Sequence, residues 1–172
     1  LSHDYSSLFG GAGNDIIYTG AASDAVEGGT GNDTVFGGSE SDTLLGGEGN
    51  DQLYGGGGND VLVAGAGVDL LFGGEGQDHF VFQAVSDSAA GARTRDVIKG
   101  FVIGEDKIDI RDLMPNADLV ESFTGQAGEI TLRNYGHGYV MVTFDTDGDH
   151  KGDMQINVLT GGLALSAADF LI

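Results

Sequence analysis

The chain has 172 residues, of which 40% are hydrophobic, and this suits one ordinary domain or two small ones. Its charge is unusual, because 27 acidic side chains face only seven Lys and Arg, giving a formal net charge of −20. This charge argues against nucleic acid or an anionic membrane as a partner, and it opposes a compact fold unless a cation is bound. The absence of cysteine excludes disulfides and thiolate zinc sites. No apolar run approaches the roughly 20 residues of a transmembrane helix.

The first residues carry little pattern. The chain begins at Leu1 rather than at a methionine, so we expect it to be a fragment of a longer protein. We interpret residues 1–9 as a lead-in or a decayed repeat, with Leu8 and Phe9 at the end of that repeat.

A period of nine residues then runs from Gly10 to Val81 without insertion. The second place of each repeat is glycine, the sixth is aspartate and the eighth is apolar. The aspartates at the sixth place are Asp15, Asp24, Asp33, Asp42, Asp51, Asp60, Asp69 and Asp78. A fixed period of this kind indicates a solenoid of stacked units.

Within a repeat, the glycine-rich first six residues favour a turn and the last three favour a short strand whose eighth place faces inward. Carboxylates and unobstructed glycine carbonyls are the oxygen ligands that calcium prefers, so each turn is a candidate half-site for calcium. The glycines whose carbonyls we expect to contribute are Gly11, Gly13, Gly29, Gly31, Gly47, Gly49, Gly56, Gly58, Gly65 and Gly67. Metal binding at such turns would contribute folding free energy directly.

Alternate repeats end in aromatic residues, namely Tyr18, Phe36, Tyr54 and Phe72, at intervals of 18 residues. If one coil takes two repeats, these rings lie in one column about 4.8 Å apart, and the repeats divide between two parallel sheets. The column either covers a sheet face or serves as a sugar-binding platform. Turns two repeats apart then stack, which allows at most six calcium sites along the two edges. Because Ala22 and Glu40 replace glycine at the fourth place, the site between repeats two and four should be the weakest.

After Phe80 the repeat decays. We expect residues 86–95 to form a surface loop, followed by strands near 96–102 and 106–110 with Ile98, Phe101, Ile108 and Ile110 in the core. Further short strands are predicted at 129–132, 139–144 and 154–159, and together these segments would close the end of the solenoid as a β-rich cap.

An acidic segment in the cap is a candidate for an additional calcium site. It places carboxylates at Asp145, Asp147, Asp149 and Asp153, but its glycine, Gly148, does not match an EF-hand loop. A plain acidic hairpin turn is the alternative interpretation.

The repeats GGAGNDIIY, GGTGNDTVF, GGEGNDQLY and GGGGNDVLV resemble RTX nonapeptides, GGxGxDxUx, which form calcium-binding parallel β-rolls. The segments DVIKGFVIGEDKIDI, SFTGQAGEITL and ADFLI resemble the C-terminal domain of serralysin-type metalloproteases and of other enzymes exported by type I secretion. The calcium-binding repeat modules of alginate (mannuronan C5) epimerases are similar as well.

The resemblance implies an all-β fold: a right-handed parallel β-roll of eight repeats at residues 10–81, two per coil, and a β-rich cap at 82–172. It implies a domain that folds on extracellular calcium and serves the secretion and stabilisation of an attached enzyme, a zinc metalloprotease in the first place. The partners would be the type I secretion apparatus of a Gram-negative bacterium and an upstream catalytic domain. The secretion signal would be Asp169, Phe170, Leu171 and Ile172.

We expect no catalysis in this chain itself, because its four histidines lack HExxH spacing and no GxSxG motif occurs. The alternative function is contact with an acidic polysaccharide, as in an epimerase module. A local basic patch would then consist of Arg93, Arg95, Lys99, Arg111, Arg133 and Lys151.

Overall fold

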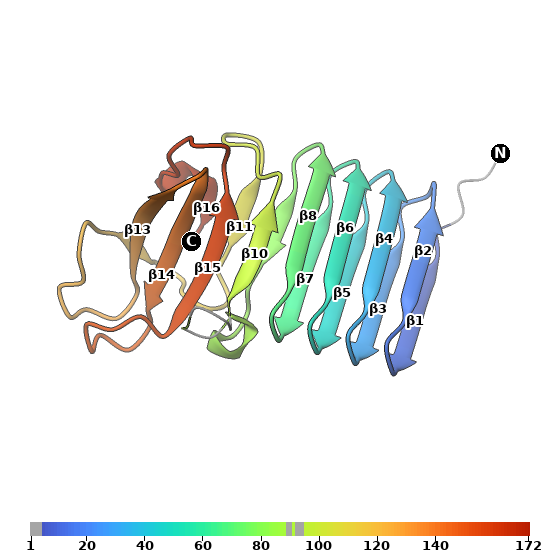
Figure 1. Ribbon diagram of the computed structural model, residues 1–172, viewed down its shortest axis with the longest axis horizontal. Helices are drawn as coiled ribbons and strands as arrows, with labels where there is room; N and C mark the ends of the chain where they lie inside the picture. Colours follow the sequence, from blue (N-terminus) through green and yellow to red (C-terminus); the bar gives the residue numbers. More distant parts are fainter. Residues whose placement is uncertain (1–4, 89–90, 92–94) are drawn as a thin grey trace.

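The computed structural model describes residues 5–88, 91 and 95–172. This part of the chain is all-β, a parallel β-solenoid of about four turns with little helix, as the repeat pattern predicts. Two sheets lie face to face and run the length of the molecule (Figure 1). Residues 1–4, 89–90 and 92–94 lie outside the described residues, so the expectations for Arg93 and for the start of the lead-in stay predictions.

The strands of the two sheets alternate along the repeats. The seven-stranded sheet has the order β1 (Ser7–Ala12), β3 (Ala25–Thr30), β5 (Thr43–Glu48), β7 (Val61–Ala66), β9 (His79–Val81), β11 (Lys107–Asp109) and β16 (Phe170–Leu171). The nine-stranded sheet has the order β12 (Asp118–Leu119), β13 (Glu129–Gly136), β14 (Tyr139–Asp145), β15 (Met154–Leu159), β10 (Asp96–Lys99), β8 (Leu70–Glu75), β6 (Gln52–Gly57), β4 (Thr34–Ser39) and β2 (Ile16–Gly20).

Parallel pairing in the roll follows an 18-residue register. Val35 on β4 lies opposite Leu53 on β6, and Leu44 on β5 lies opposite Leu62 on β7. Two repeats therefore make one coil. The predicted aromatic column is present on the outer face of the nine-stranded sheet, with ring centroids 4.7 to 4.8 Å apart and nearly parallel planes. Because the rings stack on one another, their faces inside the column are not free to bind a sugar.

The predicted three-residue strands are too short. Most strands of the roll have six residues and continue through the Gly-Gly of the next repeat, as in Thr34–Ser39. Pairing with the neighbouring coils on both sides overrides the weak strand propensity of glycine. The eighth and first places both face inward, so Val35 is fully buried and Gly37 is buried beside it.

The cap continues the roll rather than forming a separate layer. Strand β10 pairs with β8 and β15, and β11 pairs with β9 and β16, so both sheets run on into the C-terminal residues. The four predicted core residues of this region are at most 4% exposed. Strands β13, β14 and β15 form the antiparallel part of the nine-stranded sheet and include the predicted segments.

The prediction of a surface loop at residues 86–95 is wrong for the first residues of this segment. Residues Val85–Ser88 form a short 3-10 helix, η1, in which Asp87 and Ser88 are buried. The Ser88 hydroxyl donates to the Gln155 carbonyl oxygen over 2.7 Å and accepts the Asp96 N–H over 2.7 Å. This segment therefore connects β15 to β10 through hydrogen bonds.

The described part of the chain contains no helix with the length and hydropathy needed to span a bilayer.

Candidate metal centre

The turns along both edges of the roll carry the predicted aspartates, and these form two ladders. In each ladder the Oδ1 atom of one aspartate accepts the backbone N–H of the aspartate 18 residues earlier. Asp33 Oδ1, for example, accepts from Asp15 over 2.8 Å, and Asp51 Oδ1 accepts from Asp33 over 2.8 Å. On the other edge, Asp42 Oδ1 accepts from Asp24 over 2.8 Å. The structure thus brings the aspartates together in the pairs that stacked turns predict.

Both ladders continue beyond the repeats to two aspartates that sequence reasoning missed. Asp96 Oδ1 accepts the Asp69 N–H over 2.7 Å, and Asp106 Oδ1 accepts the Asp78 N–H over 3.0 Å. Each ladder therefore has five aspartates, and the expected limit of six stacked pairs becomes eight. The available signal was an aspartate two residues before a buried apolar residue, Ile98 or Ile108, as at the sixth and eighth places of a repeat.

The second carboxylate oxygen identifies the ladders as a candidate metal centre. Oδ2 is buried and has no hydrogen-bond partner in nine of the ten ladder aspartates, all except Asp106. At Asp106, Oδ2 accepts the Val102 N–H over 2.8 Å. A buried carboxylate oxygen without a partner is costly. A row of such atoms is therefore a candidate site for cations.

Glycines at the first place, which sequence reasoning did not single out, line the same space. A methyl group built on Gly28 would lie 2.6 Å from Asp33 Oδ2 and 2.6 Å from the carbonyl oxygen of Gly46. At Gly37 the corresponding distances are 2.5 Å to Asp42 Oδ2 and 2.7 Å to the Gly55 carbonyl oxygen. At Gly28 and Gly37, carboxylate and carbonyl oxygens therefore converge in a space that a methyl group would crowd, although Thr19 and Ala64 occupy the first place in two other repeats. This donor set matches the preference of calcium for hard oxygen ligands.

The glycines predicted at the second and fourth places allow the turns to stack closely. Gly29 has a φ of +115°, and a methyl group there would lie 2.1 Å from the Gly11 carbonyl oxygen. The fourth-place Gly31 donates its N–H to the Glu48 carbonyl oxygen over 2.8 Å. At the two turns predicted to be weaker, Glu40 adopts a positive φ of 73°, whereas Ala22 does not adopt one. The backbone strain expected on the even edge is therefore confined to Glu40.

Asparagines at the fifth place form a further row of hydrogen bonds between stacked turns, beside one of the two aspartate ladders. Asn14 Oδ1 accepts the Asn32 N–H over 2.8 Å, Asn32 Oδ1 accepts the Asn50 N–H over 2.7 Å, and Asn50 Oδ1 accepts the Val68 N–H over 2.9 Å. The frequent Asn-Asp pair therefore has two roles. The asparagine fastens one turn to the next, while the aspartate supplies the buried oxygen.

Burial is the main cause of raised pKa values along the ladders, and neighbouring carboxylates add to it. The pKa of Asp60 and of Asp69 rises from 3.8 to about 7, and that of Asp96 rises to about 8. The pKa is raised in the same direction for Asp42, Asp51, Asp78 and Asp106. A cation beside these groups would lower their pKa values, so metal binding near neutral pH would release protons.

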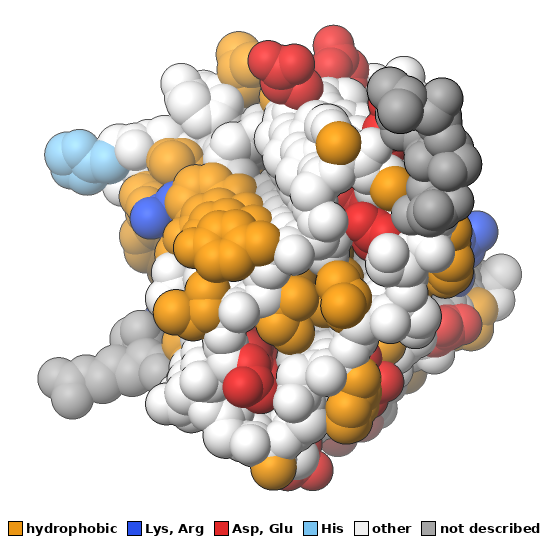
Figure 2. Space-filling model, turned by 90° about the vertical axis from the view of Figure 1, so that its right-hand side faces the viewer, with side chains coloured by type: hydrophobic (Ala, Val, Ile, Leu, Met, Phe, Trp, Pro, Cys, Tyr) orange, Lys and Arg blue, Asp and Glu red, His pale blue; other side chains and the backbone are white. Residues whose placement is uncertain are grey.

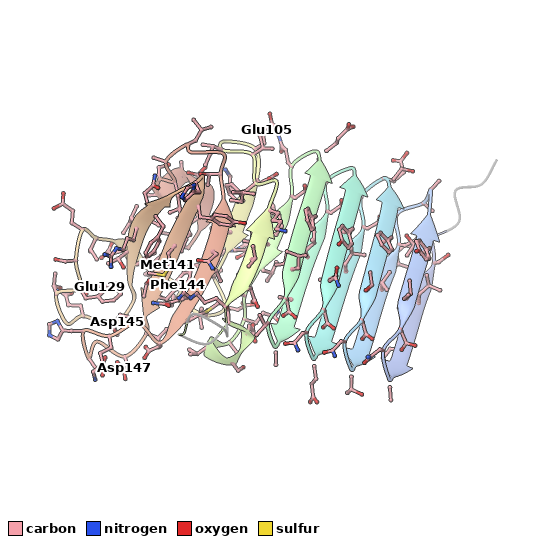
Figure 3. The ribbon with its side chains drawn as sticks, in the orientation of Figure 1. Glu105, Glu129, Met141, Phe144, Asp145 and Asp147 are labelled. Atoms are coloured by element: carbon pink, nitrogen blue, oxygen red, sulfur yellow. The ribbon has the colours of Figure 1, made fainter. Side chains whose placement is uncertain are left out.

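The acidic turn of the cap gathers three of its four predicted carboxylates. Oxygens of Asp145, Asp147 and Asp149 lie within 4.8 Å of one another. Asp145 and Asp147 lie toward the end of the cap (Figure 3). Asp153 instead accepts the Thr146 N–H over 2.8 Å. The Asp145 carboxylate already accepts the N–H groups of Gly148 and His150. Since hydrogen bonds within the turn already engage this carboxylate, calcium binding at the turn stays a prediction.

The predicted secretion signal lies in the folded end of the seven-stranded sheet. Asp169 is buried, and its Oδ2 accepts the N–H and hydroxyl of Ser166 over 2.8 and 3.0 Å. Phe170 is buried as part of β16, whereas Ile172 is 43% exposed. The segment therefore has a structural role in the fold.

Of the six cations expected to form a basic patch, two pair with carboxylates and one lies outside the described residues. Arg111 pairs with Asp109 and Lys151 pairs with Asp149, each over 2.5 Å, while Arg93 is outside the described residues. Over the described ranges, Arg95, Lys99 and Arg133 form no ion pair with a carboxylate.

These three cations lie on or beside the outer face of the nine-stranded sheet. Lys99 Nζ lies 5.5 Å from the centre of the Phe72 ring, and the Arg133 guanidinium lies 5.2 Å from that of Tyr135. Arg95 lines a groove of about 380 Å³ together with Val97, Tyr135, Tyr139 and Asn157.

Comparison with known proteins agrees with this geometry. Residues 3–172 match the family described as peptidase M10 serralysin C terminal. The chain belongs to this family. Known members of the serralysin C-terminal family and its relatives are non-catalytic modules of larger enzymes. A comparison with curated proteins found no match.

Two solved structures of the mannuronan C5-epimerase of Azotobacter vinelandii are similar. The AlgE6R2 subunit is 26% identical with a TM-score of 0.62, over 96% of this chain and 91% of that one. The AlgE6R3 subunit is 25% identical with a TM-score of 0.57, over 99% of this chain and 80% of that one. Both named resemblances, to serralysin-type domains and to epimerase repeat modules, are thereby confirmed.

Proposed function

We propose that this serralysin C-terminal domain binds calcium along both edges of its roll and folds when it meets extracellular calcium. The observation that carries the proposal is the row of buried aspartate Oδ2 atoms without hydrogen-bond partners. Bound calcium would supply positive charge and fill the coordination that these oxygens lack. The residues that would hold it are the ladder aspartates, with carbonyl oxygens of the glycine-rich turns.

Because the chain is strongly negative, calcium binding should also promote its folding. At −20, with 32 glycines to order, the chain has a strong tendency to stay unfolded when cations are scarce. Ligands that bind only the folded state stabilise it by mass action, so folding would follow the calcium concentration. A domain with this behaviour stays extended in a calcium-poor cytosol and folds outside the cell.

A calcium titration followed by far-UV circular dichroism, with magnesium as control, tests the proposal. We expect a cooperative change from coil to β-structure at extracellular calcium levels. Asp51→Ala removes a carboxylate shared by two stacked pairs and should lower the affinity or the cooperativity, whereas the exposed Asp112→Ala should change neither. Asp42→Ala, on the edge with non-glycine turns, should have a smaller effect than Asp51→Ala. A chain that is folded in chelator and indifferent to calcium would contradict the proposal.

For the whole protein, we propose that the domain serves type I secretion of an attached enzyme, a zinc metalloprotease in the first place, from a Gram-negative bacterium. Export would use the end of the chain before it folds as β16. Ile172→Ser separates the two roles, because Ile172 is half exposed and its replacement should leave calcium-induced folding intact. Loss of export of a fused reporter with normal folding supports the signal, and unchanged export contradicts it.

A second candidate function is contact with an acidic polysaccharide. Within the described residues, Arg95, Lys99 and Arg133 form no ion pair with a carboxylate and lie on or beside the outer face of the nine-stranded sheet, where Arg95 lines the groove. The aromatic column would not take part as a platform, since its ring faces are occupied by one another. Titration with polymannuronate in calcium tests this. Arg95→Ala should weaken binding, and Arg111→Ala, whose side chain is paired with Asp109, should not. Equal affinities would remove this candidate.

A further inference from the structure

Each stacked pair of ladder aspartates lies beside the first-place residue of one repeat. At Gly46, for example, a methyl group would lie 2.5 Å from Asp51 Oδ2, and it would also crowd the carbonyl oxygen of Ala64. A side chain at the first place therefore enters the space in which the donor oxygens of that pair converge. Six of the eight repeats have glycine at this place, namely Gly10, Gly28, Gly37, Gly46, Gly55 and Gly73.

The other two repeats carry a side chain at the first place. Thr19 belongs to β2, the edge strand at the end of the molecule that faces the viewer in Figure 2, and Ala64 belongs to β7 in the other sheet. Thr19 lies beside the stacked pair that begins with Asp24, and Ala64 lies beside the pair that begins with Asp69. Both aspartates have a buried Oδ2 atom without a hydrogen-bond partner, as at the other pairs. Only the first place differs.

The Thr19 hydroxyl occupies one of the oxygens that line its site. It donates to the carbonyl oxygen of Gly37. One coil further along the same edge, the space beside Gly37 is lined by the equivalent oxygens, since a methyl group there would lie 2.5 Å from Asp42 Oδ2 and 2.7 Å from the Gly55 carbonyl oxygen. A cation beside Thr19 would therefore have to displace a hydrogen bond that the pairs beside glycine do not contain.

Ala64 brings a methyl group to the equivalent place on the other edge. Strand β5 pairs with β7 so that Leu45 lies opposite Val63 and Gly47 opposite Gly65, which places Ala64 opposite Gly46. Ala64 is fully buried, so its methyl group points into the roll. The listed register of β7 with β9 ends at Val63, one residue before Ala64, so the next coil need not approach this methyl group closely.

The two side chains stand at opposite ends of the two edges. Thr19 lies beside the first stacked pair of its edge, whereas Ala64 lies beside the last stacked pair of the other edge. Each edge therefore keeps an uninterrupted run of pairs beside glycine. Within such a run, neighbouring pairs share an aspartate, so the binding of one cation can assist the next.

We propose that the first-place residue sets the calcium affinity of the pair beside it. The pairs beside the six glycines form a tight class, and the pairs beside Thr19 and Ala64 form a weak class that fills only at higher calcium concentration. The inference rests on the proposed function, because it assumes that the pairs bind calcium. It adds which pairs bind first and which residues decide this.

The test measures calcium binding to the full chain by competition with a chromophoric chelator, and the number of bound ions by native mass spectrometry. Thr19→Gly and Ala64→Gly should each transfer one calcium ion from the weak class to the tight class. We expect the affinity of the altered site to rise roughly tenfold, the effect of relieving overpacking in a close-packed site. The converse variant, Gly55→Ala, should move one ion from the tight class to the weak class.

The direction of the change separates this role from a structural one. Glycine in a strand weakens the fold, so a residue with a merely structural role would lower calcium binding when replaced by glycine. Thr43→Gly and Ala66→Gly, at exposed positions of β5 and β7, are the matched controls and should leave both classes unchanged.

The outcomes distinguish this inference from the calcium proposal. If the parent binds no calcium, the proposed function fails and the inference fails with it. If the parent binds calcium in a single class, or if Thr19→Gly and Ala64→Gly bind as the parent does, the inference alone is overturned. A glycine variant that does not fold leaves the decision to Gly55→Ala, and an unchanged tight class in that variant would also overturn the inference.

Discussion

Replacing Asp96 by asparagine should change the stability of the roll in opposite directions with and without calcium. Asp96 is fully buried, and burial together with the charge of Asp69 raises its pKa from 3.8 to about 8 in the metal-free fold. The folded pKa lies above the unfolded one, so the ionised form destabilises the fold. This penalty is absent below about pH 4, grows between pH 4 and pH 8, and is complete above pH 8.

A pKa raised from 3.8 to about 8 corresponds to at most about 6 kcal/mol of destabilisation when the carboxylate is ionised. Relaxation and water entry lower this figure in real interiors. The asparagine amide carries no charge but leaves a buried N–H group unpaired, which costs about 1 to 3 kcal/mol. We therefore expect Asp96→Asn to stabilise the metal-free fold by about 2 kcal/mol at pH 8. In calcium it should destabilise the fold, because the carboxylate is then lost as a ligand.

The assay is far-UV circular dichroism in chelator from pH 4 to pH 9, followed by urea unfolding in calcium at pH 8. The parent should fold as the pH falls, and Asp96→Asn should shift the midpoint of this folding to higher pH. Asp112→Asn, at an exposed position outside the ladders, is the matched control. The reasoning is refuted if Asp96→Asn folds at a lower pH than the parent in chelator, or if it is as stable as the parent in calcium.

Three further substitutions probe the core, the turns and the outer face. Leu53→Ala, in the centre of the roll and fully buried, should cost about 2 to 5 kcal/mol in urea unfolding in calcium. Gly28→Ala should lower calcium affinity in isothermal titration while keeping every carboxylate, because its methyl group would crowd Asp33 Oδ2 and the Gly46 carbonyl oxygen. Phe36→Ala removes a stacked ring from the column and should cost about 1 kcal/mol, with an unchanged number of calcium ions by native mass spectrometry.

The repeat made most of the roll predictable because its register is local and uninterrupted. The constant sixth and eighth places determine which side chains reach the edge and which reach the core, and the 18-residue spacing of Tyr18 and Phe36 determines the length of a coil. The repeat pattern does not reveal which groups are hydrogen-bonded to one another. Asn14 looks like an ordinary turn residue, and only the stacked fold shows that it accepts the N–H of Asn32.

The continuation of the ladders was missed because the intervals change after the repeats. Asp96 follows its ladder neighbour by 27 residues and Asp106 by 28, since the chain leaves the roll to form η1 and the turn at residues 100–106. A search at the fixed interval therefore ends at Asp78. The buried Ser88 was missed for a related reason: a small polar segment looks exposed unless the groups that it serves, here Asp96 and Gln155, are known.

Each ladder aspartate divides its two oxygens between different partners, and this links the charge of the chain to its folding. Oδ1 accepts a backbone N–H of the neighbouring turn and so helps to fix the shape of the coordination space. Oδ2 is left buried, and its charge is tolerated only beside a cation. Since each inner aspartate belongs to two stacked pairs, a cation at one pair also relieves repulsion at the next. Binding should therefore be cooperative along each edge. Under the proposed function, the carboxylates that oppose folding without calcium would be the same ones that hold the coils together when calcium is bound.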